Sequence, residues 1–593
     1  MNIAEQIRKT AKTTLESLYG LTINENDIQI NETKPEFEGD YTLVLFSFIK
    51  QLKKSPDQLG KEIGDHLVND NPDFFSAYNV IKGFLNLTVK DEYWVEFLGK
   101  NHADANFGKK SLTGKKVMVE YSSPNTNKPL HLGHLRNNFL GWSVAEILKA
   151  DGADVTKTCI VNDRGIHICK SMIAWQLFAN GETPENTGKK GDHFVGDYYV
   201  RFNDEYKKQI EELVSNGMNK EEAEKEAPIM KAAQQMLFDW EAGKPEVMAL
   251  WKKMNNWVYD GFSITYKRIG SDFDKMYYES NTYLLGKDIV NKGSEKGVFY
   301  KKDDGSVWID LTADGLDEKL VMRRDGTSVY ITQDIGLAEQ KFNEYKPNES
   351  IYVIGDEQNY HMKVLKLIAE KMKLPGAEGI YHLSYGMVEL PTGRMKSREG
   401  TVVDADDLVD EMIFQAEKKT KDQGKTEGFT VDELKELYEM VGLGGIKFFL
   451  LRVDPKKRMV FNPEESIDLH GFTATFIQYT HARIKSILRK EKAVNSQRPV
   501  VHSYLLKLEK ALIVKLEQYS TIVKQAAEEH NPSVLAIYAF ELAKGFNTFY
   551  TEHSVMNAES DEKKQLRLKL SEMTANVIAS AMGLLGIKVP ERM

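Results

Sequence analysis

The pattern of apolar and polar residues divides the chain into three parts. In the first part, residues 3–18, 41–52 and 59–67 carry apolar side chains at helical spacing, and residues 83–89 alternate in the manner of a strand. This mixture predicts a separate α+β domain over residues 1–110.

The second part alternates short apolar runs with helical segments from residue 111 to 467. Residues 116–121, 155–161 and 350–355 form short apolar runs with β-branched side chains, which is typical of buried parallel strands. Alternating strands and helices predict an open parallel sheet with helices on both faces, and therefore an α/β fold. Residues 182–257 are charged and helical without a strand signal, so we predict that they form a helical insertion.

The third part, residues 468–593, is wholly helical in its pattern. Its amphipathic segments should pack as an all-α bundle, since each has one apolar face to bury. These segments lie at residues 472–487, 505–514, 534–549 and 566–585.

Composition narrows the class of protein without deciding its function. Hydrophobic residues make up 41% and charged residues 28% of the 593 positions, which are ordinary values for a globular protein. Only Cys159 and Cys169 are present, which excludes a disulfide framework and a multi-cysteine zinc site. The first residues lack a secretory signal pattern and no apolar run approaches the ~20 residues of a membrane span, so we expect a cytoplasmic protein without a membrane partner.

The net charge of −9 argues at first against a polyanionic partner. Its distribution is uneven, because residues 470–593 contain 17 lysines and arginines against 12 acidic residues. A nucleic acid would bind most readily there, although the same excess fits a solvated helical surface.

The first candidate site is the turn between the strand at 116–121 and a helix that should start near His131. Pro129 presets the backbone for that helix, Gly133 leaves space for a ligand, and the helix N-terminus favours an anion such as phosphate. His131 and His134 lie on the same side of the first turn and can both donate hydrogen bonds to that anion. Taken alone, the motif favours a capped helix whose histidines are surface polar groups.

A second cluster covers residues 328–336. Tyr330 and Asp334 are four residues apart, so a phenol and a carboxylate share one helical face. A carboxylate is the natural partner of a planar guanidinium, because it accepts two parallel hydrogen bonds and neutralises the charge. A helix cap is the alternative for Asp334. A third cluster, the basic segment 393–403, would alone be read as a hairpin turn.

The segment 121–134 resembles the HIGH signature of class I aminoacyl-tRNA synthetases, and residues 120–137 resemble its arginyl-tRNA synthetase version. Residues 37–41 and 83–89 are similar to the appended N-terminal domain of that family, which contacts the tRNA elbow. Residues 476–484 and 546–550 are similar to its anticodon-binding helices. The resemblance covers nearly the whole chain and implies a Rossmann-like catalytic domain between an N-terminal α+β domain and a C-terminal anticodon-binding bundle.

The resemblance implies an arginine–tRNA ligase that uses ATP with magnesium as a substrate complex, L-arginine and tRNA, with no tightly bound metal. Arginine would be activated to arginyl-adenylate, in a step that can require bound tRNA, and then transferred to the 3′-terminal ribose. We expect a monomer. The alternatives are another class I synthetase, cysteinyl or glutamyl, or a non-catalytic tRNA-binding paralogue. Missing zinc ligands and the Tyr330 and Asp334 pair disfavour the former, and the retained His131, His134, Asp334 and Gln358 disfavour the latter.

Residue roles follow from the same resemblance. Catalysis is assigned to His131, His134, Lys128, Lys396 and Arg398, and nucleotide binding to His131, Gly133, His134, Lys396, Ser397 and Arg398. Substrate binding is assigned to Glu120, Ser123, Asn125, His134, Tyr330, Asp334 and Gln358, while Asp356 and His361 flank Gln358 and are expected to serve the nucleotide. Contacts to tRNA are assigned to Asn86, Tyr479, His481 and Arg483.

The segment 393–403 occupies the place of the second class I signature, the KMSKS loop, but departs from it. Arg394 stands at the first lysine, Lys396 at the first serine and Ser397 at the second lysine. Cationic side chains there would stabilise charge as pyrophosphate separates. In this family the lysine ahead of the first signature, here Lys128, is thought to compensate, so the division of labour among Lys128, Lys396 and Arg398 stays open.

Overall fold

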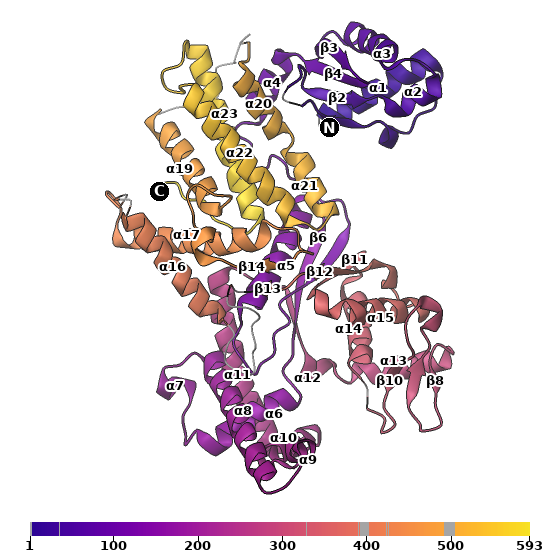
Figure 1. Ribbon diagram of the computed structural model, residues 1–593, viewed down its shortest axis with the longest axis vertical. Helices are drawn as coiled ribbons and strands as arrows, with labels where there is room; N and C mark the ends of the chain where they lie inside the picture. The colour runs from indigo at the N-terminus through magenta and orange to yellow at the C-terminus, as the bar shows by residue number, and fades with distance from the viewer. Residues whose placement is uncertain are drawn as a thin grey trace.

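The computed structural model describes residues 3–34, 36–327, 329–389, 391, 403–422, 424, 426–491 and 504–593. Figure 1 shows a central sheet with the helical bundle and the N-terminal domain above it and a helical arm below it. Among the described helices, none combines the length and apolar character that a membrane crossing requires.

The N-terminal domain is built on an antiparallel sheet. Its strand order is β1 (Ile30–Glu32), β2 (Tyr41–Val44), β4 (Phe84–Val89) and β3 (Phe75–Ile81). Around the sheet lie α1 (Ile3–Tyr19), α2 (Phe46–Leu52), α3 (Pro56–Asp70) and α4 (Asp91–Asn101). The prediction of one helix over residues 41–52 is wrong in its first half. Strand β2 pairs with β4 there, and this tertiary pairing overrides the helical spacing of the apolar residues.

The central sheet is parallel throughout, in the order β12 (Ile380–Tyr385), β11 (Glu349–Gly355), β5 (Lys116–Glu120), β6 (Asp154–Val161) and β7 (Lys275–Tyr278). Strands β6 and β7 follow β5 on one side of the sheet, and β11 and β12 then lie on the other side of β5. Ligands of such sheets bind at the carboxyl ends of the strands where the order reverses. The fold therefore points to the edge between β5 and β11.

Two additions interrupt the sheet. A strand-free helical arm follows β6, within the described residues, and includes the predicted insertion; its helices are α6 (Ile166–Phe178), α7 (Pro184–Thr187), α8 (Gly191–Ser215), α9 (Lys220–Glu226), α10 (Pro228–Glu241) and α11 (Pro245–Ile269). A second addition was not predicted. It contains α12 (Glu279–Thr282), α13 (Leu285–Glu295) and the antiparallel strands β8 (Tyr300–Lys301), β9 (Val307–Ile309) and β10 (Lys319–Met322).

The remaining helices complete the sheet and form the bundle. Helices α5 (Leu132–Ala150), α14 (Tyr330–Tyr345) and α15 (Asn359–Lys371) belong to the sheet domain. A short parallel pair follows, formed by β13 (Val388–Glu389) and β14 (Met459–Val460). Between these two strands the chain forms α16 (Ala405–Asp422) and α17 (Val431–Leu451). The helices after β14 are α18 (Pro463–Ser466), α19 (Ala474–Lys490), α20 (Lys507–Glu517), α21 (Tyr519–Glu528), α22 (Pro532–Glu552) and α23 (Asp561–Leu584).

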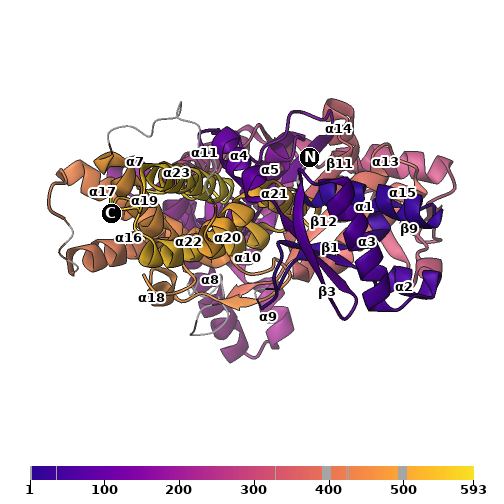
Figure 2. The same cartoon turned by 90° about the horizontal axis from the view of Figure 1, so that it is seen from above.

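One hydrophobic core runs through the N-terminal domain, the sheet and the bundle. Polar contacts reinforce it, since Glu517 of α20 accepts a hydrogen bond from the Ile3 amide at 2.7 Å and Lys510 pairs with Asp40 at 3.0 Å. Helix α4 of the N-terminal domain packs against α20 and α23, and the view from above shows the domain beside the bundle (Figure 2). Removing the bundle would therefore expose buried surface of both other parts.

Candidate active site

The turn after β5 has an unusual backbone that its neighbours hold in place. Ser122 and Ser123 both have positive φ, 77° and 48°, which side chains other than glycine rarely adopt. Asn137 of α5 accepts a hydrogen bond from the Ser122 amide, and the Ser122 hydroxyl lies 2.6 Å from the Tyr266 hydroxyl of α11. Strained backbone that persists because its surroundings fix it is common at functional sites.

The two histidines cap helix α5 reciprocally. The Gly133 amide donates to Nδ1 of His131 at 3.1 Å, and the His131 amide donates to Nδ1 of His134 at 3.1 Å. Burial, followed by the charge of Lys128, lowers the pKa of His131 to about 3, and burial lowers the pKa of His134 well below its ordinary value. Both rings are thus neutral at pH 7. Because each Nδ1 accepts a proton, each Nε2 carries one and is a donor.

Gly133 has a different role from the one predicted. A Cβ at this position would lie 2.9 Å from Cε1 of His131, so the missing side chain makes room for the His131 ring itself. The glycine is needed for the cap, and through it for the position of the histidine.

The segment that follows the basic cluster returns to this turn. The Leu132 amide donates to the Val403 carbonyl at 3.1 Å, and the Ala405 amide donates to the Leu130 carbonyl at 3.0 Å. A cavity of about 230 Å³ lies at this junction, lined by side chains that include Lys128, His131 and Asp404. The candidates Lys396, Ser397 and Arg398 lie outside the described residues.

Asp334 lies on the first turns of α14, beside a histidine. Its Oδ2 is 2.7 Å from Nε2 of His361, and its side chain is 47% exposed. Tyr330 starts the helix and is 72% exposed. His361 was expected to serve the nucleotide; the structure instead places it as the partner of the Asp334 carboxylate.

Glu120 ends β5 and is buried. Its carboxylate forms an ion pair with Lys341 of α14, and their side chains are 8% and 2% exposed. The predicted substrate-binding residue therefore already has a cationic partner.

Sequence analysis missed a third carboxyl group at this edge of the sheet. Glu279 directly follows β7, and burial raises its pKa to about 7, with the charge of Asp334 contributing in the same direction. Arg164 opposes the shift. The sequence signal was present, since an acidic residue follows a short strand, but residues 275–278 gave no clear strand pattern from which to recognise it.

The three remaining substrate candidates occupy strand ends. Ser123 and Asn125 belong to the turn after β5, where Asn125 forms a bridge to Asn162 beyond β6. Gln358 closes the short 3₁₀ turn after β11 and is exposed. Glu120 and the turn thus stand at the carboxyl end of β5 and Gln358 stands at that of β11, the two strands that flank the reversal point. Asp334 lies on α14 beside His361, which follows Gln358 by three residues.

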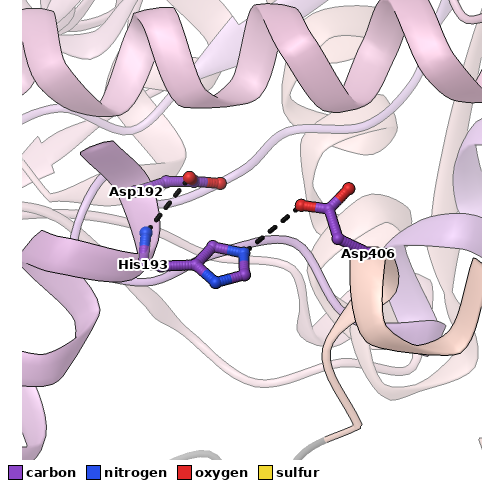
Figure 3. Close-up of side chains that lie close together, drawn as sticks. All are labelled: Asp192, His193 and Asp406. Atoms are coloured by element: carbon purple, nitrogen blue, oxygen red, sulfur yellow. Dashed lines mark hydrogen bonds and ion pairs between the residues drawn. The ribbon is translucent and has the colours of Figure 1, made fainter. Parts of the chain in front are cut away.

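A cluster of ionisable groups joins α8 to α16. Asp192, His193 and Asp406 place potential metal ligands within 4.8 Å of one another (Figure 3). Nζ of Lys190, however, lies 2.9 Å from Asp192 Oδ2 and 2.6 Å from Asp406 Oδ2, so an ammonium already supplies the positive charge. Although burial opposes it, hydrogen bonds from His193 and Lys190 hold the pKa of Asp406 below its usual range. We assign this cluster a structural role, fastening the insertion to α16.

The tRNA candidates of the bundle fall into two groups. Tyr479 and Arg483 line a cavity of about 500 Å³ that Arg592 and Met593 also line. The Arg483 guanidinium lies 4.9 Å from the Tyr479 ring centre. His481 is different, because it is 2% exposed and its Nδ1 lies 2.9 Å from the Pro590 carbonyl oxygen.

Asn86 is likewise buried, with 1% exposure in the N-terminal sheet. It accepts a hydrogen bond from Thr42 at 2.6 Å and donates one to Asn79 at 2.8 Å. In this structure neither Asn86 nor His481 presents its side chain to a bound RNA. Their expected contact with tRNA is therefore corrected to a structural role.

Three family models match the chain in order. The model described as arginyl tRNA synthetase N terminal domain matches residues 2–89, the one described as tRNA synthetases class I (R), catalytic domain, matches residues 100–462, and the DALR anticodon binding domain matches residues 477–593.

Full-length relatives agree with these models. The arginine–tRNA ligases of Bacteroides thetaiotaomicron and Flavobacterium psychrophilum are each 52% identical to this chain, with 100% of both sequences covered. The solved arginyl-tRNA synthetase of Thermus thermophilus superposes with a TM-score of 0.79 at 22% identity and covers 100% of each chain. At that identity the superposition shows the fold alone, and it confirms the predicted fold class.

Proposed function

Because the chain belongs to the class I arginyl-tRNA synthetase family, we propose that the turn of His131 and His134 and the carboxylates around Asp334 carry out arginine–tRNA ligation. The enzyme joins arginine to its tRNA with consumption of ATP. One observation supports our assignment of the site above all. The Glu120 carboxylate at the end of β5 pairs with Lys341, and Asp334 acts electrostatically both on that lysine and on Glu279, which follows β7. Three carboxyl groups are thus linked at the carboxyl ends of the strands, where ligands of such sheets bind.

The whole assignment is tested by pyrophosphate exchange with each amino acid, run with and without tRNA. Exchange dependent on arginine alone is the expected result. Exchange with cysteine or glutamate, or none at all, would favour the alternative synthetases or the non-catalytic paralogue.

In the first step a carboxylate oxygen of arginine attacks the α-phosphorus of ATP in line. The new oxygen–phosphorus bond forms as the bond to pyrophosphate breaks, and pyrophosphate leaves with the electron pair. The Nε2–H groups of His131 and His134 donate to the phosphate oxygens, and Lys128 adds positive charge. Magnesium enters with ATP as part of the substrate. Lys396, Ser397 and Arg398 are proposed to act on the departing pyrophosphate.

The second step needs no enzyme nucleophile. A hydroxyl of the terminal ribose attacks the carbonyl carbon of the adenylate, and AMP leaves. We assign most of the rate enhancement to positioning of the reactants and to stabilisation of charge in the transition state. Ser123, Asn125 and Gln358 hold the amino and carboxylate ends of arginine, while Asp334 and Glu279, with Tyr330 beside them, receive its guanidinium.

Arginine binding should depend on pH through Glu279. The free enzyme holds this carboxyl with a pKa of about 7, so it is largely protonated below that value, whereas a guanidinium favours the ionised form. The KM for arginine should therefore rise about tenfold as the pH falls from 8 to 6, because binding then has to displace a proton. Steady-state kinetics at saturating ATP measure this.

Glu279→Gln is the matched control for that profile, since glutamine cannot ionise. We expect a higher KM that no longer changes between pH 6 and 8. The histidines do not titrate in this range, because burial lowers their pKa values far below it. A pH-dependent KM in Glu279→Gln would assign the effect to another group.

The cavity beside α19 is proposed to receive tRNA bases. Aromatic rings stack on bases, and arginine contacts both bases and phosphates. Tyr479, Tyr550 and Arg483 provide these groups together, and Arg489 and Arg592 add positive charge. The N-terminal domain is proposed to contact the tRNA elbow through surface residues other than Asn86.

Arg483→Gln should weaken tRNA binding and reduce its salt dependence. The loss of one phosphate or base contact should lower affinity by about tenfold and the slope of log Kd against log salt by about 1. Equilibrium binding at several salt concentrations measures both, with Lys231→Gln on the distant helix α10 as a charge-matched control. Unchanged affinity and slope would exclude Arg483 from the tRNA interface.

We extend the proposal to the whole protein. Residues 1–110, 111–467 and 468–593 act as tRNA-elbow, catalytic and anticodon-binding domains. The enzyme works as a monomer in the cytoplasm, where translation takes place.

A further inference from the structure

The carboxylate that ends β5 is paired with a deeply buried lysine. Lys341 follows Asp334 by seven residues on α14, which is two helical turns and so the same face. Its Nζ forms an ion pair with Oε2 of Glu120, and the two side chains are 2% and 8% exposed. Such burial requires a partner, because an unpaired ammonium in the interior is costly.

Aromatic rings complete the surroundings of this ammonium. Nζ lies 5.0 Å from the ring centre of Tyr352 on β11 and 5.4 Å from that of Tyr277 on β7. Burial by itself would lower the pKa of Lys341, but the charge of Glu120, with a further contribution from Asp334, outweighs it and raises the pKa. Lys341 therefore stays charged at neutral pH and acts on both carboxylates.

We propose that Lys341 is a positioning residue for arginine recognition, which fixes the orientation of the Glu120 carboxylate and offsets part of the negative charge around the amino acid. This inference rests on the proposed function. Carboxylates that lie near one another repel unless a cation lies among them, and a buried charge without a partner is costly. Lys341 supplies that cation on the same helix that carries Asp334, so one element sets the geometry of both acidic groups.

The inference also explains how Glu120 can be buried and still accept a hydrogen bond from a substrate. One carboxylate oxygen is committed to Lys341, which fixes the orientation of the other. A charged donor that arrives with arginine then meets a carboxylate that needs no reorganisation. Lys341 itself need not touch arginine for this effect.

Lys341→Met tests the role, because methionine keeps most of the volume and removes the charge. In pyrophosphate exchange with tRNA present, KM for arginine should rise about tenfold or more, while KM for ATP stays within about twofold. Lys341→Arg keeps the charge and should restore most of the arginine affinity. Lys292→Met on α13, whose ammonium forms a surface pair with Glu339, is the matched control and should behave as the wild type.

A double-mutant cycle separates positioning from a general effect on folding. In a Glu120→Gln background the Lys341→Met substitution should raise the arginine KM little further, because its target has lost its charge. The double variant removes both buried charges together, so its comparison with Glu120→Gln remains where Lys341→Met alone fails to fold. An arginine KM about tenfold or more above that of Glu120→Gln would then overturn the inference. Equal changes in the arginine and ATP KM values, or full additivity in the cycle, would overturn the inference. Absence of arginine-dependent exchange in the wild type would instead overturn the proposed function.

Discussion

Replacing Asp334 by asparagine should lower kcat/KM for arginine by about 10² to 10³, since a charged partner of the guanidinium is lost while the shape is kept. The carboxylate is 47% exposed in the free enzyme, and the neighbouring His361 nitrogen at 2.7 Å holds one of its oxygens. Arginine would bury this group, so most of its contribution arises on binding. Steady-state pyrophosphate exchange with tRNA present measures kcat/KM for arginine in the variant and in the wild type.

The loss should be specific to the amino acid. The KM for ATP and the affinity for tRNA should change little, because Asp334 on α14 is proposed to contact only the guanidinium, whereas the histidines that cap α5 are proposed to contact the phosphates. Asp317→Asn is the matched control, as its side chain is 86% exposed beside β10. If Asp334→Asn retained near-normal kcat/KM, the guanidinium would have to be recognised elsewhere and Glu279 would be the first alternative.

His361→Ala tests the contact between His361 and Asp334. The substitution frees the Asp334 carboxylate to rotate, so we expect arginine affinity to fall, but by less than in Asp334→Asn. The structure places His361 beside Asp334, the proposed partner of the guanidinium, and the expected role of His361 toward the nucleotide stays a prediction.

Local patterns predicted the parts of the fold that depend on neighbours in sequence. The strand at 116–120, the helix that begins after His131 and the strand at 349–355 were all expected within a few residues of their observed bounds. The predicted helix over residues 41–52 is wrong in its first half because Tyr41 to Val44 pair with β4, which lies 40 to 46 residues further along the chain. Strands β8 to β10 were missed because each is four residues or shorter.

Candidate residues divide in the same way. Asp334 and the two histidines could be proposed because each lies in a short segment that resembles a family motif. Glu279 and Lys341 could not, since each matters only through side chains that the sheet brings near from distant parts of the chain. Burial explains the other differences, because Asn86 and His481 match the family in sequence yet bond to neighbouring protein groups.

The histidine pair carries the second large prediction, and its geometry allows the two nitrogens of each ring to be tested separately. Asparagine places an acceptor where Nδ1 stands and is a good helix cap, but it lacks the distal donor. His131→Asn and His134→Asn should therefore lower adenylate formation by about 10² or more, by comparison with the loss of single donors at oxyanion sites. Their thermal stability and tRNA affinity should stay close to those of the wild type.

Glutamine tests the opposite half of the ring. Its amide nitrogen can reach the position of Nε2, while the acceptor that caps α5 is lost. His131→Gln should therefore keep more adenylation activity than His131→Asn and should lose about 1 kcal/mol of stability, because residue 131 is the N-cap of α5 and glutamine is not a favoured N-cap residue. Single-turnover adenylate formation and thermal unfolding together distinguish the two variants. Equal activity in both would mean that the histidines serve the enzyme by capping the helix, and the proposed donation from Nε2 to the phosphate would have to be abandoned.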